Sequence, residues 1–325
     1  MDFGIWPGVV RSDLVRFDTE IDAPPEDIER TRLALTELAG QARRFYVRCY
    51  RGHGGGQPPT PASPRPYLGD NRVVDLVLGY GCEDPAGFAR AAAAAVREVA
   101  ELGGGKIQVC EEVNAPAPQD GGRAGCHDAL ARGLTAALAE RDRLGAEVLV
   151  GFNAAVALPG DPFWDNVRSH VPPEVLARVD YVGLDFFPDV FRPLPAARLP
   201  GAVQHVLRAF RDSATDVGLP PQVPIHLTET GWPTGPEHPE HQQAQLLGTV
   251  AGAVLEIAAE VNIDAYELFG LRDGLTTGPR MNRFGILRDD HSPKPAFETF
   301  RHLIAATRPV PSAARGVSAG TRTRG

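Results

Sequence analysis

Short apolar segments alternate with longer amphipathic segments along nearly the whole chain, and this alternation most limits the available folds. Eight runs have the length, β-branched or aromatic content and flanking turn residues of strands. They span residues 2–6, 43–50, 73–80, 106–114, 146–154, 179–187, 223–229 and 263–271. Strands separated by helical segments predict crossover connections and therefore a parallel sheet.

Helix start and stop signals support this interpretation. The segment 24–40 begins with prolines and acidic residues and ends in glycine, and the alanine-rich segment 84–105 ends in glycines. Further helices are predicted at residues 121–145, 202–218, 241–261 and 295–307. Eight such units over roughly 300 residues predict a single-domain (β/α)8 barrel. We place it at residues 1–308, followed by a small, polar and basic tail at 309–325 that we expect to be disordered.

An open doubly wound sheet is the alternative fold. It usually carries a glycine-rich phosphate-binding turn directly after its first strand. Here Trp6, Pro7 and Gly8 follow that strand, and the glycines at 52–56 run into prolines rather than into a helix. We therefore favour the barrel and interpret residues 51–71 as a long loop.

Charge and composition narrow the range of partners. A net charge of −8 argues against nucleic acid and anionic membranes as partners. No run of about 18 apolar residues is evident, so no membrane-spanning helix is predicted. The N-terminal residues lack the pattern of a secretory signal, which predicts a cytoplasmic protein, or a secreted one if the N-terminus is incomplete. The four cysteines form no C-x-x-C pair, and His238 and His241 lack further ligands nearby, so no metal site is expected.

Several strands of the predicted barrel end in polar side chains. The active site of such a barrel lies at the carboxyl ends of its strands. The polar residues at these ends are Arg48, Glu111, Glu112, Asn153, Asp185 and Glu229. Carboxylates are costly to bury without partners, so several of them in one cleft imply a function. Glycoside hydrolysis uses two such groups, one as an acid and the other as a nucleophile or base.

Three segments resemble a known family. LTETGWPTG at 227–235 is very similar to the nucleophile segment of β-glucanases and related endo-glycosidases. IQVCEEVN at 107–114 is similar to the W-E-I-W-N-E-P-N type of segment, and residues 282–304 resemble the common ending of the same group. Over residues 3–304, the chain thus resembles the (β/α)8-barrel retaining glycoside hydrolases of clan A.

The resemblance implies a role for each matched residue. Glu229 corresponds to the nucleophile and Glu112 to the acid/base of a retaining mechanism on a carbohydrate or glycoside, without a metal or organic cofactor. Arg48 would keep Glu229 ionised, Glu112 would need a raised pKa, and Trp232 would help form a sugar-binding wall. The remaining expected substrate contacts are Glu111, Asn153, Asp185, Phe187 and Tyr266.

Three departures from the family pattern keep other functions open. Glu111 replaces an asparagine that contacts the sugar 2-hydroxyl, and Phe187 replaces a tyrosine that hydrogen-bonds the nucleophile. Tyr266 and Phe269 lie where a tryptophan usually forms the floor of the site. A catalytically impaired barrel that binds carbohydrate is therefore the main alternative. A metal-assisted lyase or isomerase on the same fold is a third.

Overall fold

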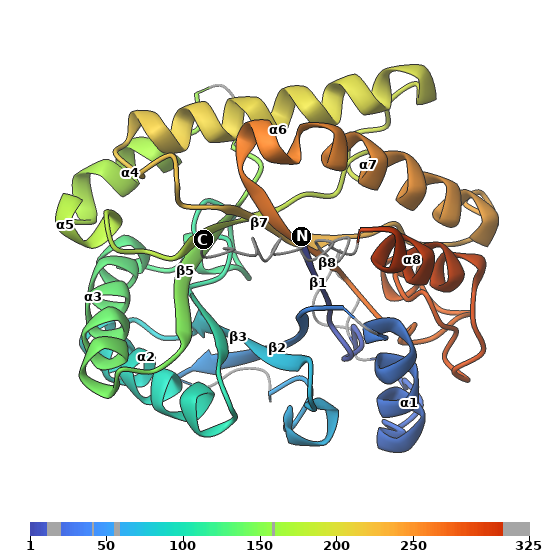
Figure 1. Ribbon diagram of the computed structural model, residues 1–325, viewed down its shortest axis with the longest axis horizontal. Coiled ribbons are helices and arrows are strands. Elements are labelled where there is room, and N and C mark those ends of the chain that lie inside the picture. The colour runs from blue at the N-terminus through green and yellow to red at the C-terminus, as the bar shows by residue number, and fades with distance from the viewer. Residues whose placement is uncertain (12–20, 41, 55–58, 158–159, 308–325) are drawn as a thin grey trace, which may run out of the picture.

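The computed structural model describes residues 1–11, 21–40, 42–54, 59–157 and 160–307, and the predicted tail lies outside these residues. Eight parallel strands close into a barrel in chain order, with β8 pairing with β1 (Figure 1). The predicted (β/α)8 barrel is therefore confirmed. The strands are β1 Asp2–Ile5, β2 Phe45–His53, β3 Arg72–Tyr80, β4 Gly105–Val109, β5 Val148–Ala155, β6 Tyr181–Asp185, β7 Ile225–Thr230 and β8 Ile263–Leu268.

The helices surround the strands as an outer ring (Figure 1). They are α1 Ile28–Ala39, α2 Pro85–Glu101, α3 Cys126–Leu144, α4 Phe163–His170, α5 Pro173–Leu176, α6 Leu199–Asp216, α7 Glu240–Val261 and α8 Pro295–Ala306. Side chains cap the starts of two of these helices: the Asp27 carboxylate accepts from the backbone N–H of Arg30 in α1, and Asp84 accepts from that of Gly87 in α2. The short helices α4 and α5 lie between β5 and β6, where the sequence predicted no helix.

Helix α7 is long and apolar enough to cross a membrane by length and composition alone, which the search for apolar runs in the sequence did not anticipate. In the barrel it packs between α6 and α8, and its buried residues include Leu247, Val250 and Val254. Packing on both sides as well as on the strands accounts for the apolar composition of such a helix.

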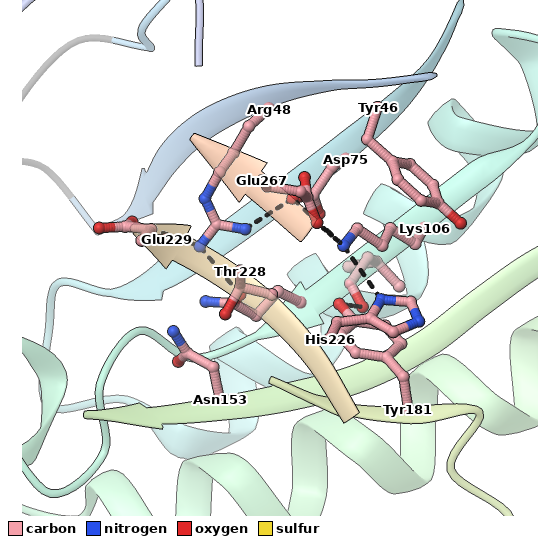
Figure 2. A network of polar contacts seen from close by, with 12 residues as sticks. Tyr46, Arg48, Asp75, Lys106, Asn153, Tyr181, His226, Thr228, Glu229 and Glu267 are labelled. Carbon is pink, nitrogen blue, oxygen red and sulfur yellow. Dashed lines mark hydrogen bonds and ion pairs between the residues drawn. The ribbon is translucent and has the colours of Figure 1, made fainter. Parts of the chain in front are cut away.

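The interior of the barrel holds charged side chains rather than only aliphatic ones. The register sets Arg48, Asp75 and Lys106 opposite one another on β2, β3 and β4. All three side chains are fully buried. Lys106 Nζ donates to Glu267 of β8 and lies 3.7 Å from Asp75 Oδ2. Its ammonium also lies 4.4 Å from the centre of the Tyr46 ring (Figure 2).

His226 of β7 also belongs to this cluster of buried polar side chains, which we call the floor of the barrel. Lys106 Nζ lies 3.2 Å from His226 Nδ1, and because lysine can only donate, Nδ1 accepts. The opposite nitrogen, Nε2, therefore carries the proton and donates to Asp264 Oδ1 at 2.8 Å. Burial and the neighbouring Lys106 lower the pKa of His226 to about 4. The histidine is neutral and structurally satisfied, as expected of a packed residue within a strand.

Replacing Lys106 tests the buried charges of the floor. Lys106→Met removes the donor to Glu267 and leaves Asp75 with Arg48 as its main counter-charge. We expect the free energy of unfolding to fall by about 3–5 kcal/mol, because breaking a buried pair leaves a carboxylate without compensation. Urea unfolding at neutral pH measures this loss.

The matched control is Arg97→Met, which removes the pairing of a partly exposed arginine with Glu140. It should cost less than about 1 kcal/mol. Equal losses in the two variants would show that the floor network contributes no special stability.

Candidate active site

Glu229 reaches the barrel interior because β7 is irregular near its end. The pairing of β7 with β8 shifts between Leu227 and Thr230, and its pairing with β6 shifts at Leu184 and Asp185. Strict alternation would turn Thr228 and Glu229 to opposite faces. The irregularity lets both contact interior groups, because Thr228 Oγ1 donates to Asp185 Oδ1. Glu229 Oε1 lies 3.4 Å from Arg48 Nη2, and Figure 2 shows Arg48 of β2 together with Thr228 and Glu229 of β7.

Arg48 connects most of the polar groups at the mouth of the barrel. Its Nη1 donates to Asp75 Oδ2 at 2.6 Å, and its Nη2 donates to Gln108 Oε1 at 3.0 Å. The same Nη2 lies 3.4 Å from Glu229 Oε1. Nε donates to the hydroxyl oxygen of Tyr50 at 2.8 Å, and that hydroxyl donates to Glu229 Oε1. Two donors from β2 thus converge on one oxygen of Glu229.

The chain leaves the regular geometry of β4 before the two glutamates. Cys110 and Glu112 both have left-handed backbone angles, with φ of 68° and 42°. Regular strand alternation would place Gln108 and Glu112 on one face, but it does not apply here. Instead Gln108 Nε2 donates to Glu111 Oε2, and this oxygen lies 3.7 Å from Arg48 Nη2. The backbone N–H of Glu111 is held by Asp120 Oδ2 at 2.8 Å.

Glu112 is positioned through its backbone and leaves its carboxyl group unengaged. Its N–H donates to Asn153 Oδ1 at 2.8 Å, and Asn153 Nδ2 donates to Asp185. Within the described ranges, no hydrogen bond or ion pair involves the Glu112 carboxyl oxygens. Burial is the main cause that raises the pKa of Glu112 to about 8, and the nearby Glu229 carboxylate is the second cause. This carboxyl group is therefore protonated at neutral pH and available to a ligand.

Carboxyl groups outnumber cations at this end of the barrel. Oxygens of Glu111, Asp185 and Glu229 all lie within 4.8 Å of one another. Burial, together with this crowding, raises the pKa of Glu111 and of Asp185 well above their ordinary values. Such a cluster could hold a cation by distance alone. Arg48 already contacts Glu111 and Glu229, however, and a metal ion would have to compete with its guanidinium.

Aromatic side chains line the rim beside the carboxyl groups. The Trp6 ring stacks on Phe269 at a centroid distance of 4.6 Å and meets Tyr50 edge-on at 5.4 Å. Phe269 in turn meets Phe187, and Phe187 meets the exposed Phe191. Phe187 and Phe269 remain partly accessible. Flat apolar surfaces of this kind suit the C–H faces of a sugar ring.

Two expected substrate contacts lie elsewhere. Trp232 is only 4% exposed, and its Nε1 donates to Pro188 O at 2.8 Å, so it packs the loops after β6 and β7 together instead of forming an open wall. Tyr266 is 1% exposed and meets Phe3, whose ring also contacts Phe300 of α8. It therefore faces the helical layer outside the barrel, away from the carboxyl groups at the barrel mouth.

The structure brings together most of the other residues singled out in the sequence: Arg48, Glu111, Glu112, Asn153, Asp185 and Glu229. It adds Tyr50, Asp75, Gln108 and Trp6, which the sequence analysis missed. Tyr46, Arg48 and Tyr50 are spaced two apart on β2, so alternation from Arg48 could have identified Tyr50. Trp6 carried a weaker signal, as an aromatic residue directly after the first strand.

The raised pKa of Glu112 predicts how stability varies with pH. The folded protein holds this proton up to about pH 8, whereas the ordinary glutamate pKa is 4.5. The stability it contributes is therefore complete below about pH 4.5 and is lost as the pH rises through about 8. Glu112→Gln should gain at least about 1 kcal/mol of unfolding free energy relative to wild type between pH 5 and pH 8.5.

Urea unfolding at the two pH values measures this gain. Glu260→Gln is the control, because Glu260 is an exposed carboxylate paired with Arg208 and its pKa is lowered. The control should show no such gain. A Glu112→Gln variant whose difference from wild type is constant with pH would contradict a protonated Glu112.

Comparisons with known proteins bear on the fold. A scan of protein-family models gave no match, and neither did a comparison with curated proteins. Among solved structures, 328 chains match. They include a GH5_18 enzyme from Streptomyces cattleya in complex with GlcNAc, with 17% identity and a TM-score of 0.57 over 88% of this chain and 77% of that one.

Two further matches have larger chains. A GH39 enzyme from Xanthomonas axonopodis pv. citri has 13% identity and a TM-score of 0.59, covering 94% of this chain and 66% of that one. A β-glucuronidase from Ruminococcus gnavus has 12% identity and a TM-score of 0.57, covering 93% of this chain and 48% of that one. The chain thus has the (β/α)8 fold of these glycoside hydrolases, in agreement with the resemblance seen in its sequence.

Proposed function

We propose that the protein is a glycoside hydrolase that cleaves an O-glycosidic bond with retention, with Glu229 as nucleophile and Glu112 as acid/base. The observation that carries this proposal is the contrast between the two groups. Glu229 accepts hydrogen bonds from Arg48 and Tyr50 at one oxygen, Oε1, so its carboxylate is held in place. Glu112 has a pKa of about 8 and an unengaged carboxyl group. One carboxylate held by two donors and a second carboxyl group that keeps its proton and has no hydrogen-bond partner match a nucleophile and an acid.

The chemistry proceeds in two displacements. In the first, an oxygen of Glu229 attacks the anomeric carbon and the bond to the leaving oxygen breaks. The Glu112 proton passes to that leaving oxygen. In the second, the ionised Glu112 takes a proton from water, the water oxygen attacks the anomeric carbon, and the bond to Glu229 breaks. The acid is then protonated again and the nucleophile is ionised.

Neighbouring groups would bind the sugar. Burial and the neighbouring carboxyl groups raise the pKa values of Glu111 and Asp185, which favours protonated forms that can donate hydrogen bonds to sugar hydroxyl groups. Asn153 holds both the backbone of Glu112 and the side chain of Asp185, so it would orient the acid. Phe187 and Phe269 offer apolar faces at the rim. Bound sugars in structural neighbours, such as GlcNAc in the GH5_18 enzyme, support a carbohydrate as the substrate class.

A catalytically impaired barrel that binds carbohydrate is the second candidate. The presence of Glu111 in place of an asparagine and of Phe187 in place of a tyrosine favours it. Both candidates predict sugar binding, but only the enzyme predicts turnover that depends on Glu229.

A panel of chromogenic aryl glycosides, differing in the sugar, tests the proposal. Wild type should hydrolyse at least one of them. Glu229→Ala should lose at least about 10³-fold in kcat/KM, since no nucleophile remains to form the intermediate. Glu112→Ala should lose about 10²–10⁴-fold on substrates with poor leaving groups, where acid assistance matters most.

Glu260→Ala, on the outer helix α7, is the matched control and should keep wild-type rates. Circular dichroism establishes that each variant is folded. Sugar binding by calorimetry without any turnover would favour the binding barrel. Full activity of Glu229→Ala would exclude the proposed mechanism.

A further inference from the structure

We infer that Tyr50 is the positioning residue of the nucleophile, orienting Glu229 for attack from strand β2. The inference rests on the proposed function and extends it to a residue to which the family resemblance gives no role. It also answers a question raised by the sequence, where Phe187 occupies the place of a tyrosine that would hydrogen-bond the nucleophile.

The direction of the hydrogen bond follows from the partners of Tyr50. Arg48 Nε lies 2.8 Å from the Tyr50 hydroxyl oxygen, and an arginine nitrogen can only donate. The oxygen must therefore accept this bond. The single hydroxyl proton is then left for the other contact, which is Glu229 Oε1. Arg48 thus orients the hydroxyl, and the hydroxyl donates to the carboxylate.

Both donors reach the same oxygen of Glu229. Tyr50 Oη and Arg48 Nη2 contact Oε1, and in the described part of the chain no contact involves Oε2. Oε1 carries the stabilising bonds, which leaves Oε2 free to attack. A carboxylate held by one oxygen cannot turn freely about its axis, so the attacking oxygen keeps a fixed direction.

The Tyr50 ring itself is held in place on several sides. The Trp6 ring meets it edge-on, and the Arg48 guanidinium lies 5.1 Å from its centre. Its backbone N–H and C=O both pair with Thr60 at 3.0 Å. Burial raises the pKa of Tyr50 well above its ordinary value, so the hydroxyl keeps its proton at neutral pH. The donor is therefore both fixed and permanently protonated.

Phe187 cannot supply this bond. It has no hydroxyl group, and its ring packs among Phe191, Phe269 and Phe284. Phe187, directly after β6, thus contributes an aromatic ring at the rim, and Tyr50 on β2 donates the hydrogen bond to the nucleophile. Because Tyr50 supplies the hydrogen bond, the presence of phenylalanine rather than tyrosine at position 187 does not by itself indicate an inactive protein.

Tyr50→Phe tests the role of the hydroxyl and keeps the ring. On the best aryl glycoside of the panel, kcat/KM should fall about 10- to 100-fold, the loss expected when a hydrogen bond to a charged group is removed. The acidic limb of the kcat/KM profile against pH should move to higher pH, because the ionised carboxylate loses a donor. The other charged or titratable groups facing Glu229 stay in place: Arg48, Glu111, Glu112 and Asp185.

Tyr67→Phe is the matched control. Tyr67 is also buried and its hydroxyl also donates to a carboxylate, that of Glu26, away from the site. The control should leave kcat/KM and its pH profile unchanged. A Tyr50→Phe variant within about twofold of wild type, with an unmoved acidic limb, would overturn the inference.

A double-mutant cycle on stability separates this inference from the proposed function. Tyr50→Phe should lower the midpoint of thermal unfolding more in wild type than in Glu229→Ala, where only the hydrogen bond from Arg48 Nε is left to lose. Equal effects in the two backgrounds would refute the contact even in an active enzyme. A wild type that hydrolyses no glycoside would defeat the proposed function, whereas the cycle would still report whether Tyr50 holds Glu229.

Discussion

The buried guanidinium of Arg48 is the interaction on which the site depends. It is fully buried inside the barrel, where an unpaired charge would be very costly. Its donors engage Asp75, Gln108, Tyr50 and Glu229, so four side chains take their positions from one cation. The planar fork of arginine suits this task, because its five donors point in fixed directions. The register of β2, β3 and β4 determines the other contacts of this cluster, because it brings Arg48, Asp75 and Lys106 side by side.

The excess of carboxyl groups over cations explains why the pKa values of these carboxyl groups differ. Arg48 and Lys106 cannot neutralise every acid that faces them. Asp75 lies between both cations and its pKa is lowered, whereas Glu111, Glu112 and Asp185 are farther from compensation and their pKa values are raised. The pKa of Asp75 is thus lowered while that of the proposed acid, Glu112, is raised, although the charge of Arg48 acts on both carboxyl groups.

The sequence predicted the barrel well because each strand and helix carries its own local pattern and boundary signals. It also identified the strand ends, and with them Arg48, Asn153, Asp185 and the glutamates. It could not predict departures from regular geometry, such as the irregular end of β7 that directs both Thr228 and Glu229 inward. Nor could it separate exposed from buried aromatic residues: Trp6, Trp232 and Tyr266 are buried, whereas Phe187 and Phe269 stay partly accessible at the rim.

Labelling of the nucleophile tests the central claim most directly, because Glu111, Asp185 and Glu229 lie so close together. An activated 2-deoxy-2-fluoro glycoside, of the sugar that the wild type hydrolyses, slows the second displacement and lets the covalent intermediate accumulate. Peptide mass spectrometry then locates the attached sugar. The account predicts a single label on Glu229 and none in Glu229→Ala. A label on Glu111 or Asp185 would contradict it.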